Sequence, residues 1–148
     1  MASYHFHLTQ VKRSRGQSVI AQAAYRSGEK LYSTYYGESS DFTRKRGVVM
    51  AEICLPDHAP REYANRETLW NALEWAEHGR KAQLAHSFDI TLMNEFSMEE
   101  NIEMARAFVR EELVSRGMIA DFAIHDPVRP KGAEPNPHIH ILVPIRPL

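Results

Sequence analysis

The chain has 148 residues, of which 43% are hydrophobic and 25% charged, a composition that argues against disorder and suits one domain with its own core. The formal net charge of −1 names no partner, and no apolar run approaches the ~20 residues that a membrane helix needs. The N-terminal stretch has no apolar segment of a secretory signal, and the single cysteine, Cys54, excludes an internal disulfide and a thiolate zinc cluster. We therefore expect a cytoplasmic protein that does not enter a membrane.

The first half of the chain alternates strand and helix patterns. Apolar and polar residues alternate over residues 3–10, which predicts a strand with one polar face. Residues 17–31 then carry apolar residues at helical spacing, with Ser18 as the candidate N-cap. A polar and aromatic loop over 32–46 leads to an aliphatic run at 48–55, which predicts a second strand.

The second half continues the alternation and ends with two strands in succession. Ser97 and Glu100 have the spacing of a capping box before a helix of about 18 residues that Gly117 ends. The other predicted elements are a helix at 66–78 and strands at 86–93, 118–125 and 136–144. This order predicts an α+β fold, with a central, largely antiparallel sheet of about five strands and helices packed on one face.

The last predicted strand, NPHIHILVP, carries His138 and His140 on one face, because side chains alternate along a strand. Antiparallel pairing with 118–125 puts His125 on the same face, and directly opposed Cβ atoms lie ~5 Å apart. Three imidazoles that converge in this way can hold a metal ion with open positions for water or substrate. The plainer interpretation is a set of hydrogen-bonded histidines with no ligand.

A carboxylate lies in position to support these histidines. Asp89 falls on the polar side of the strand at 86–93, and metal-bound histidines usually donate their second N–H to a carboxylate. Alternatively, Asp89 is an exposed strand residue. His5 and His7 form a second His-x-His pair, but they lack a third partner on the matching face and are weaker ligand candidates.

Positive charge gathers at the start of the chain, since residues 1–50 carry +5 and residues 51–148 carry −6. A basic segment suits a polyanion such as nucleic acid, although a solvated face gives the same pattern. Within it, Tyr25 lies at the edge of the apolar stripe of its helix, close to Arg26 and Lys30. A tyrosine hydroxyl beside cations can act as a covalent nucleophile, although most helical tyrosines only pack.

Three segments together resemble the MobA/MobL family of plasmid mobilisation relaxases, which belong to the HUH endonucleases. These segments are SRGQSVIAQAAYRSGEKL, TLWNALEWAE and AIH…NPHIHILVP, and the similarity runs from residue 4 to about residue 144. The resemblance implies an HUH relaxase-like fold, with a central antiparallel sheet and helices on one side. It also implies that residues 1–148 form a single nicking domain, truncated at its C-terminus relative to longer relatives.

The resemblance assigns chemical roles to the candidate residues. His125, His138 and His140 correspond to the metal ligands, and the ion is usually Mg²⁺ or Mn²⁺, although imidazoles also suit Zn²⁺, Ni²⁺ and Co²⁺. Tyr25 corresponds to the nucleophile that attacks single-stranded DNA at an origin of transfer and leaves a 5′-phosphotyrosine and a free 3′-hydroxyl. Relatives often carry a glutamate near Ser87, so Asp89 is the residue we expect to substitute for it.

DNA contacts are expected from the basic residues and from the aromatic loop. Phosphate contacts of this kind weaken as salt rises. The candidate contacts are Lys12, Arg13, Arg15, Arg26, Arg44, Lys45 and Arg46. Tyr32, Tyr35 and Tyr36 are candidates for base stacking or for a second nucleophile. Further expected partners are the accessory proteins of a relaxosome.

Two other functions remain open from the sequence. A three-histidine site also suits a metal-dependent hydrolase of a small phosphate or ester, although Leu142 stands where the histidine-triad hydrolases carry a third histidine. The same fold also suits a DNA-binding accessory module without catalysis. The presence of Tyr25 and of all three histidines argues against that module.

Overall fold

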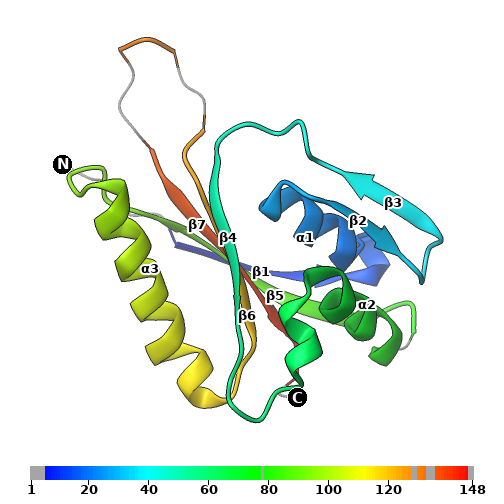
Figure 1. Ribbon diagram of the computed structural model, residues 1–148. Helices are drawn as coiled ribbons and strands as arrows, with labels where there is room; N and C mark the ends of the chain where they lie inside the picture. Colours follow the sequence, from blue (N-terminus) through cyan, green and yellow to red (C-terminus); the bar gives the residue numbers. More distant parts are fainter. Residues whose placement is uncertain (1–5, 78, 128–129, 133–135, 147–148) are drawn as a thin grey trace.

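Among the described residues, five strands form one antiparallel sheet in the order β1–β5–β7–β6–β4 (Figure 1). The computed structural model describes residues 6–77, 79–127, 130–132 and 136–146. In sheet order the strands are β1 (Phe6–Lys12), β5 (Gln83–Thr91), β7 (His138–Pro144), β6 (Ala120–His125) and β4 (Val48–Cys54). The predicted α+β class with a central antiparallel sheet is confirmed, including the hairpin that joins β6 to β7.

Helices α1 (Val19–Ser27) and α2 (Arg66–Ala76) pack together on one face of this sheet, as expected (Figure 1). Helix α3 (Met98–Glu112) covers the opposite face. Neighbouring residues of β6 show the division, because Asp121 accepts a hydrogen bond from Trp70 of α2, whereas Phe122 packs with Val109 of α3. The sheet therefore carries two separate cores, and the side chains of a strand alternate between them.

Helix α1 is shorter than predicted. Ser18 caps it as expected, since its hydroxyl accepts a hydrogen bond from the N–H of Ala21 at 3.2 Å. The helix ends at Ser27 because Gly28 adopts a left-handed conformation, with φ at +71°, and its N–H closes onto the carbonyl of Ala24. The predicted helical end at residue 31 is therefore wrong.

A small hairpin replaces part of the predicted loop at 32–46. Strands β2 (Lys30–Ser33) and β3 (Glu38–Asp41) pair antiparallel beside α1 and α2. Each strand is only four residues long, and Leu31 is the one buried apolar residue that the two strands contain, so the sequence shows no run of alternating apolar residues. That composition explains why the sequence indicates only a loop here.

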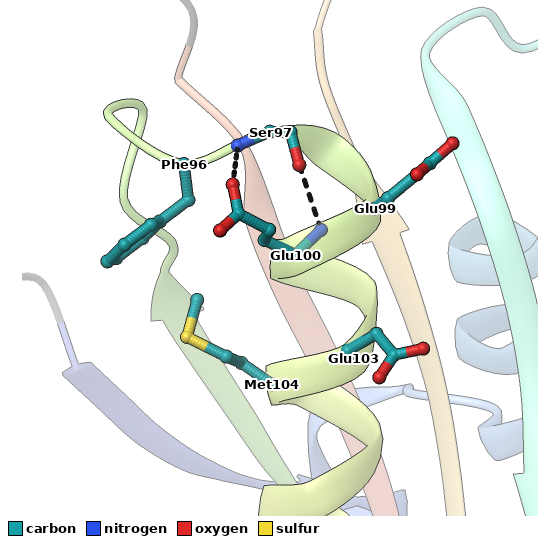
Figure 2. A pocket seen from close by; sticks show the side chains of 6 residues that line it. All are labelled: Phe96, Ser97, Glu99, Glu100, Glu103 and Met104. Atoms are coloured by element: carbon teal, nitrogen blue, oxygen red, sulfur yellow. Dashed lines mark hydrogen bonds between the residues drawn. The ribbon is translucent and has the colours of Figure 1, made fainter.

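The capping box at the start of α3 is present (Figure 2). The Ser97 hydroxyl accepts from the N–H of Glu100 at 3.1 Å, and the Glu100 carboxylate accepts from the N–H of Ser97 at 3.0 Å. After Glu112 the chain tightens into a 3₁₀ helix at Val114–Arg116, which Gly117 ends with φ at +87°. None of the described helices has both the length and the apolar content to cross a membrane.

Candidate active site

The histidines of β6 and β7 lie on the face covered by α1 and α2. His125 stands opposite His138, and His140 stands one pleat further along β7, opposite Ala123. The ring centroids of His125 and His140 are 4.4 Å apart, and those of His138 and His140 are 6.3 Å apart. The predicted parity is thus found, and the three imidazoles form one cluster.

Asp89 of β5 supports this cluster. It stands opposite His140 in the sheet, and its carboxylate accepts a hydrogen bond from Nδ1 of that ring at 2.5 Å. Burial opposes ionisation of Asp89, but the His140 hydrogen bond and charge outweigh it and lower the pKa of the carboxyl group. A hydrogen bond from Nδ1 to a carboxylate orients the His140 ring so that its Nε2 would face a ligand. On the neighbouring strand β1, His7 pairs with Asp89. His5 lies outside the described residues.

His125 connects the histidine strands to helix α1. Its Nε2 lies 2.6 Å from the carbonyl oxygen of Arg26, and a carbonyl only accepts, so the ring donates from Nε2 and keeps its lone pair on Nδ1. Burial lowers the pKa of His125 to about 4, with smaller contributions from the charges of His140 and Lys45. The ring is therefore neutral at pH 7, which is the form that binds metal ions.

Tyr25 lies directly before Arg26 and faces solvent, with 49% of its surface exposed. The Nζ of Lys45 lies 3.4 Å from the centroid of its ring, and Phe42 meets the ring edge-on with centroids 5.3 Å apart. Burial, together with the charge of Arg26, lowers the pKa of Lys45 to about 8, so most of this amine is still protonated at pH 7. The phenol therefore lies at the surface, beside a cation and next to the residue that holds His125.

Arg26 reaches inward rather than toward solvent. Its Nη2 donates to the hydroxyl of Ser87 at 2.8 Å, and its Nη1 donates to the side chain of Gln22 at 2.5 Å. Burial lowers the pKa of Arg26, although the charges of Asp89 and Asp121 oppose the shift. The sequence predicted a DNA contact at Arg26. In the structure its guanidinium links α1 to β5 on the face of the sheet that also carries the histidines.

A family model described as the MobA/MobL family matches residues 17–148, a range that includes Tyr25, Asp89 and the three histidines. The chain belongs to the MobA/MobL family. Its predicted relationship to the mobilisation relaxases is thereby confirmed.

Similar proteins agree with this family. The chain is 36% identical over 143 residues to a probable mobilization protein MobA of Bifidobacterium longum, and 35% identical over 158 residues to a conjugal transfer protein TraA of Agrobacterium fabrum. These alignments cover 97% and 100% of the chain but only 25% and 14% of the two relatives, so it spans a quarter of their length or less.

The fold is also close to a solved structure that reports the molecular basis of vancomycin resistance transfer in Staphylococcus aureus. The two share a TM-score of 0.89 and 35% sequence identity. The match covers 99% of this chain and 72% of the other. The sheet and helices that position the candidate site therefore belong to a fold already seen with a similar sequence.

The MobA/MobL relaxases generally use a divalent metal ion. Within the described ranges, no three or more His, Cys, Asp or Glu side chains are gathered closely enough to hold one. The donor chemistry nevertheless fits a divalent ion, because Asp89 orients His140 and because His125 is neutral. Of the three histidines, His125 would have to bind through Nδ1 or release the Arg26 carbonyl.

The basic residues predicted to contact DNA differ in how accessible they are. Arg15, Arg44 and Arg46 are exposed, and Lys12 is half-buried. Arg13 has only 9% of its side chain exposed, because its guanidinium donates to the Glu74 carboxylate and to the main-chain carbonyls of Glu74 and Glu77. Its Cζ lies 4.4 Å above the ring of Tyr35. These contacts give Arg13 a structural role whether or not it also contacts DNA.

Trp75 is a surface aromatic residue that was not among the residues predicted from the sequence. It is 53% exposed, and its ring centroid lies 5.0 Å from that of Tyr35. Its position on α2, away from the stripe of Leu69 and Leu73, was the available signal, because a residue off the apolar face of an amphipathic helix points toward solvent. A groove of about 550 Å³ begins beside Tyr35. It is lined by Arg13, Ser14, Tyr35, Gly79, Arg80 and Lys81.

A second groove, at the start of α3, is acidic (Figure 2). Glu99, Glu100 and Glu103 line it together with Phe96 and Met104. It lies on the helix that covers the opposite face of the sheet, away from the histidines. Because its carboxylates repel phosphate groups, this groove does not suit DNA.

Proposed function

We propose that this chain is the nicking domain of a plasmid mobilisation relaxase, a metal-dependent enzyme that cleaves single-stranded DNA at an origin of transfer. The observation that carries the proposal is the hydrogen bond from His125 to the carbonyl of Arg26. It joins the residue after an exposed tyrosine to the histidine strand β6, which supports a site where Tyr25 would act beside an ion held by the histidines. The mobilization and conjugal transfer proteins among the relatives support it.

The reaction would be a transesterification with Tyr25 as the nucleophile. The phenol oxygen attacks the scissile phosphorus, the bond from phosphorus to the 3′-oxygen breaks, and the phenol proton ends on that 3′-oxygen. The products are a 5′-phosphotyrosine and a free 3′-hydroxyl. The reverse attack reseals the strand without an energy-supplying cofactor, since the covalent link conserves the phosphodiester.

The other residues of the site would prepare this step. His125, His138 and His140 would hold the ion, which when bound neutralises charge on the phosphate. We expect Mg²⁺ or Mn²⁺ in the cell. Asp89 would keep His140 in the tautomer that binds it.

The DNA would run over the basic and aromatic surface near Tyr25. Arg15, Arg44 and Arg46 are exposed cations suited to phosphates, and their contribution would fall as salt rises. Tyr35 and Trp75 offer exposed rings for base stacking beside the basic groove. Relaxosome accessory proteins would complete the assembly in the cell.

The test is a covalent-adduct assay with Mn²⁺ and single-stranded oligonucleotides that tile the DNA around the protein's own gene. We expect one oligonucleotide to be cut and to leave its 3′ part attached to the protein, and Tyr25→Phe to abolish the attachment. The matched control is Tyr32→Phe, which removes another exposed hydroxyl and should still form the adduct.

The other outcomes separate the alternative functions. Hydrolysis of a nucleotide or phosphate ester with no DNA adduct would support the small-substrate hydrolase. Tight DNA binding without cleavage in the presence of Mn²⁺ would support the accessory module. Adduct formation that persists in Tyr25→Phe would reject this tyrosine as the nucleophile.

A further inference from the structure

The loop that follows β3 is held between helix α1 and the histidine strand β6. At its start, the N–H of Phe42 donates to the carbonyl of Glu29 at 3.1 Å. At its end, the carbonyl of Gly47 accepts from the N–H of Asp126 at 2.8 Å, one residue after His125. Backbone hydrogen bonds therefore fix both ends of the loop beside the candidate active site.

Gly47 makes this close approach possible. Its φ is +88°, and a Cβ at this position would lie 2.9 Å from the carbonyl oxygen of Asp126. Any other residue would force the loop away from β6 and strain the backbone as well. The loop is consequently set in one place relative to the histidines.

Lys45 in this loop differs from the two arginines that flank it. Arg44 and Arg46 are exposed, whereas Lys45 is half-buried and turns back onto α1. Its Nζ donates to the carbonyl oxygen of Tyr25 at 2.9 Å and lies 3.4 Å from the centroid of the Tyr25 ring. One ammonium group thus contacts both the backbone and the ring of the same tyrosine.

Phe42 adds a second contact from the same loop. Its ring meets the Tyr25 ring at 88°, with the centroids 5.3 Å apart. An exposed tyrosine at the end of a helix would otherwise sample several side-chain rotamers. The cation above the ring and the aromatic edge beside it together favour one orientation.

We propose that Lys45 is a positioning residue, whose ammonium group holds the Tyr25 ring in a single orientation beside the histidine cluster before DNA arrives. This inference rests on the proposed function, in which Tyr25 is the nucleophile. Orienting a nucleophile raises the rate of the chemical step, because less conformational freedom is lost on reaching the transition state. A plain phosphate contact would instead change the affinity for DNA.

The test compares Lys45→Met and Lys45→Arg with Arg44→Met, which removes the neighbouring exposed cation. The probe is the fluorescein-labelled form of the oligonucleotide that the wild-type protein cuts. Fluorescence anisotropy gives Kd, and single-turnover cleavage at saturating DNA gives the rate of the chemical step.

We expect Lys45→Met to slow single-turnover cleavage by about 10- to 100-fold with little change in Kd. Lys45→Arg should retain most of the rate, since a guanidinium also binds an aromatic face. Arg44→Met should weaken binding instead. A raised Kd with an unchanged rate in Lys45→Met, or two unchanged values, would overturn the proposal, as would a Lys45→Arg protein as slow as Lys45→Met.

A second measurement needs neither DNA nor activity. NMR couplings across the Cα–Cβ bond of Tyr25 should report one rotamer in the wild-type protein and averaging in Lys45→Met, with Arg44→Met as the control. Averaging already present in the wild type would reject the positioning role. If the couplings behave as expected while Tyr25→Phe still forms the adduct, then the assigned nucleophile is wrong and the ring contact stands.

Discussion

The two faces of the sheet differ in chemistry although the same strands supply both. Toward α3 the strands present Phe122, Ile124, Ile139 and Ile141, which are buried in an aliphatic and aromatic core. Toward α1 and α2, strand β6 also presents His125. The alternation of side chains lets a six-residue strand contribute to the apolar core on one side and to the candidate site on the other.

Not every polar residue on the α1 and α2 face belongs to the candidate site. Asp121 is buried there and accepts hydrogen bonds from Arg66 at 2.9 Å and from Trp70 at 2.8 Å. Burial raises the pKa of this carboxyl group, and the charge of Arg66 opposes that shift. Asp121 therefore ties α2 to the sheet, whereas His125, four residues later on the same face, ties α1 to the candidate site. A buried polar residue on this face has to be assigned by its partners.

The largest effect on stability should come from the α3 face. Phe122→Ala removes a fully buried ring and should lower the free energy of unfolding by about 3–5 kcal/mol. His140→Ala should cost much less, because that side chain is 21% exposed and lies outside the two apolar cores. Urea unfolding of both variants checks this difference. Equal losses would show that the two faces are not divided between stability and function.

The next largest effect is expected on the affinity for a metal ion at the histidine face. Asp89→Ala removes the acceptor of His140 Nδ1–H, so we expect the affinity for Mn²⁺ to fall by about 10- to 100-fold. Isothermal titration calorimetry measures this without any DNA. Asp89→Asn should lie between, because its amide oxygen still accepts the hydrogen bond.

The matched control for Asp89 is Glu103→Ala, which removes an exposed carboxylate from the helix on the other face. It should leave Mn²⁺ binding unchanged. An Asp89→Ala protein that binds Mn²⁺ as tightly as the wild type would remove the carboxylate from the proposed site.

A smaller effect on stability is expected at the start of α3. Ser97→Ala removes one half of the capping box and should cost about 1 kcal/mol, measured by thermal unfolding. DNA cleavage should be unaffected, because this helix end lies on the face away from the histidines. A loss of cleavage at a temperature where the variant is folded would argue that the two faces are coupled.

The parts of this fold that the sequence predicted are those with a strong local signal. The capping box at Ser97, the cap at Ser18 and the alternation around His138 and His140 each follow from neighbouring residues. The shared face of His125 and His140 followed from strand parity alone, once the last two strands were paired. Local rules suffice where the structure is set by periodicity.

The parts that were missed depend on contacts between distant segments. Arg26 looked like a basic surface residue, but its guanidinium reaches Ser87, 61 positions later, in the interior. Lys45 was predicted to contact DNA as part of a basic run, and only the folded loop brings it over Tyr25. Neither contact has a periodic signature, so an unaligned sequence gives no sign of it.

Alkylation of Cys54 compares the environments of the two faces in the wild-type protein, without a substitution. Cys54 lies on β4, at the edge of the α3 core, where burial and the nearby Glu52 raise its pKa to about 11. Because pH 8 is about three units below this pKa, about one thiol in a thousand is ionised in the folded protein. For a free cysteine at the same pH, about a quarter of the thiols are ionised. Alkylation by iodoacetamide, followed by mass spectrometry, should therefore be on the order of 100-fold slower in the folded protein than in urea.

Glu52→Gln tests the cause of this slow reaction. It removes the negative charge that disfavours the thiolate, so the Cys54 pKa should fall and alkylation should speed up while burial is unchanged. Fast alkylation of the folded wild type would contradict the effect of partial burial and of Glu52 on the Cys54 thiol. The same physics acts on His125 across the sheet, where burial lowers the pKa because the charged form is the protonated one. Burial thus favours the neutral form of both side chains, which slows alkylation of the thiol and leaves the imidazole with a free lone pair.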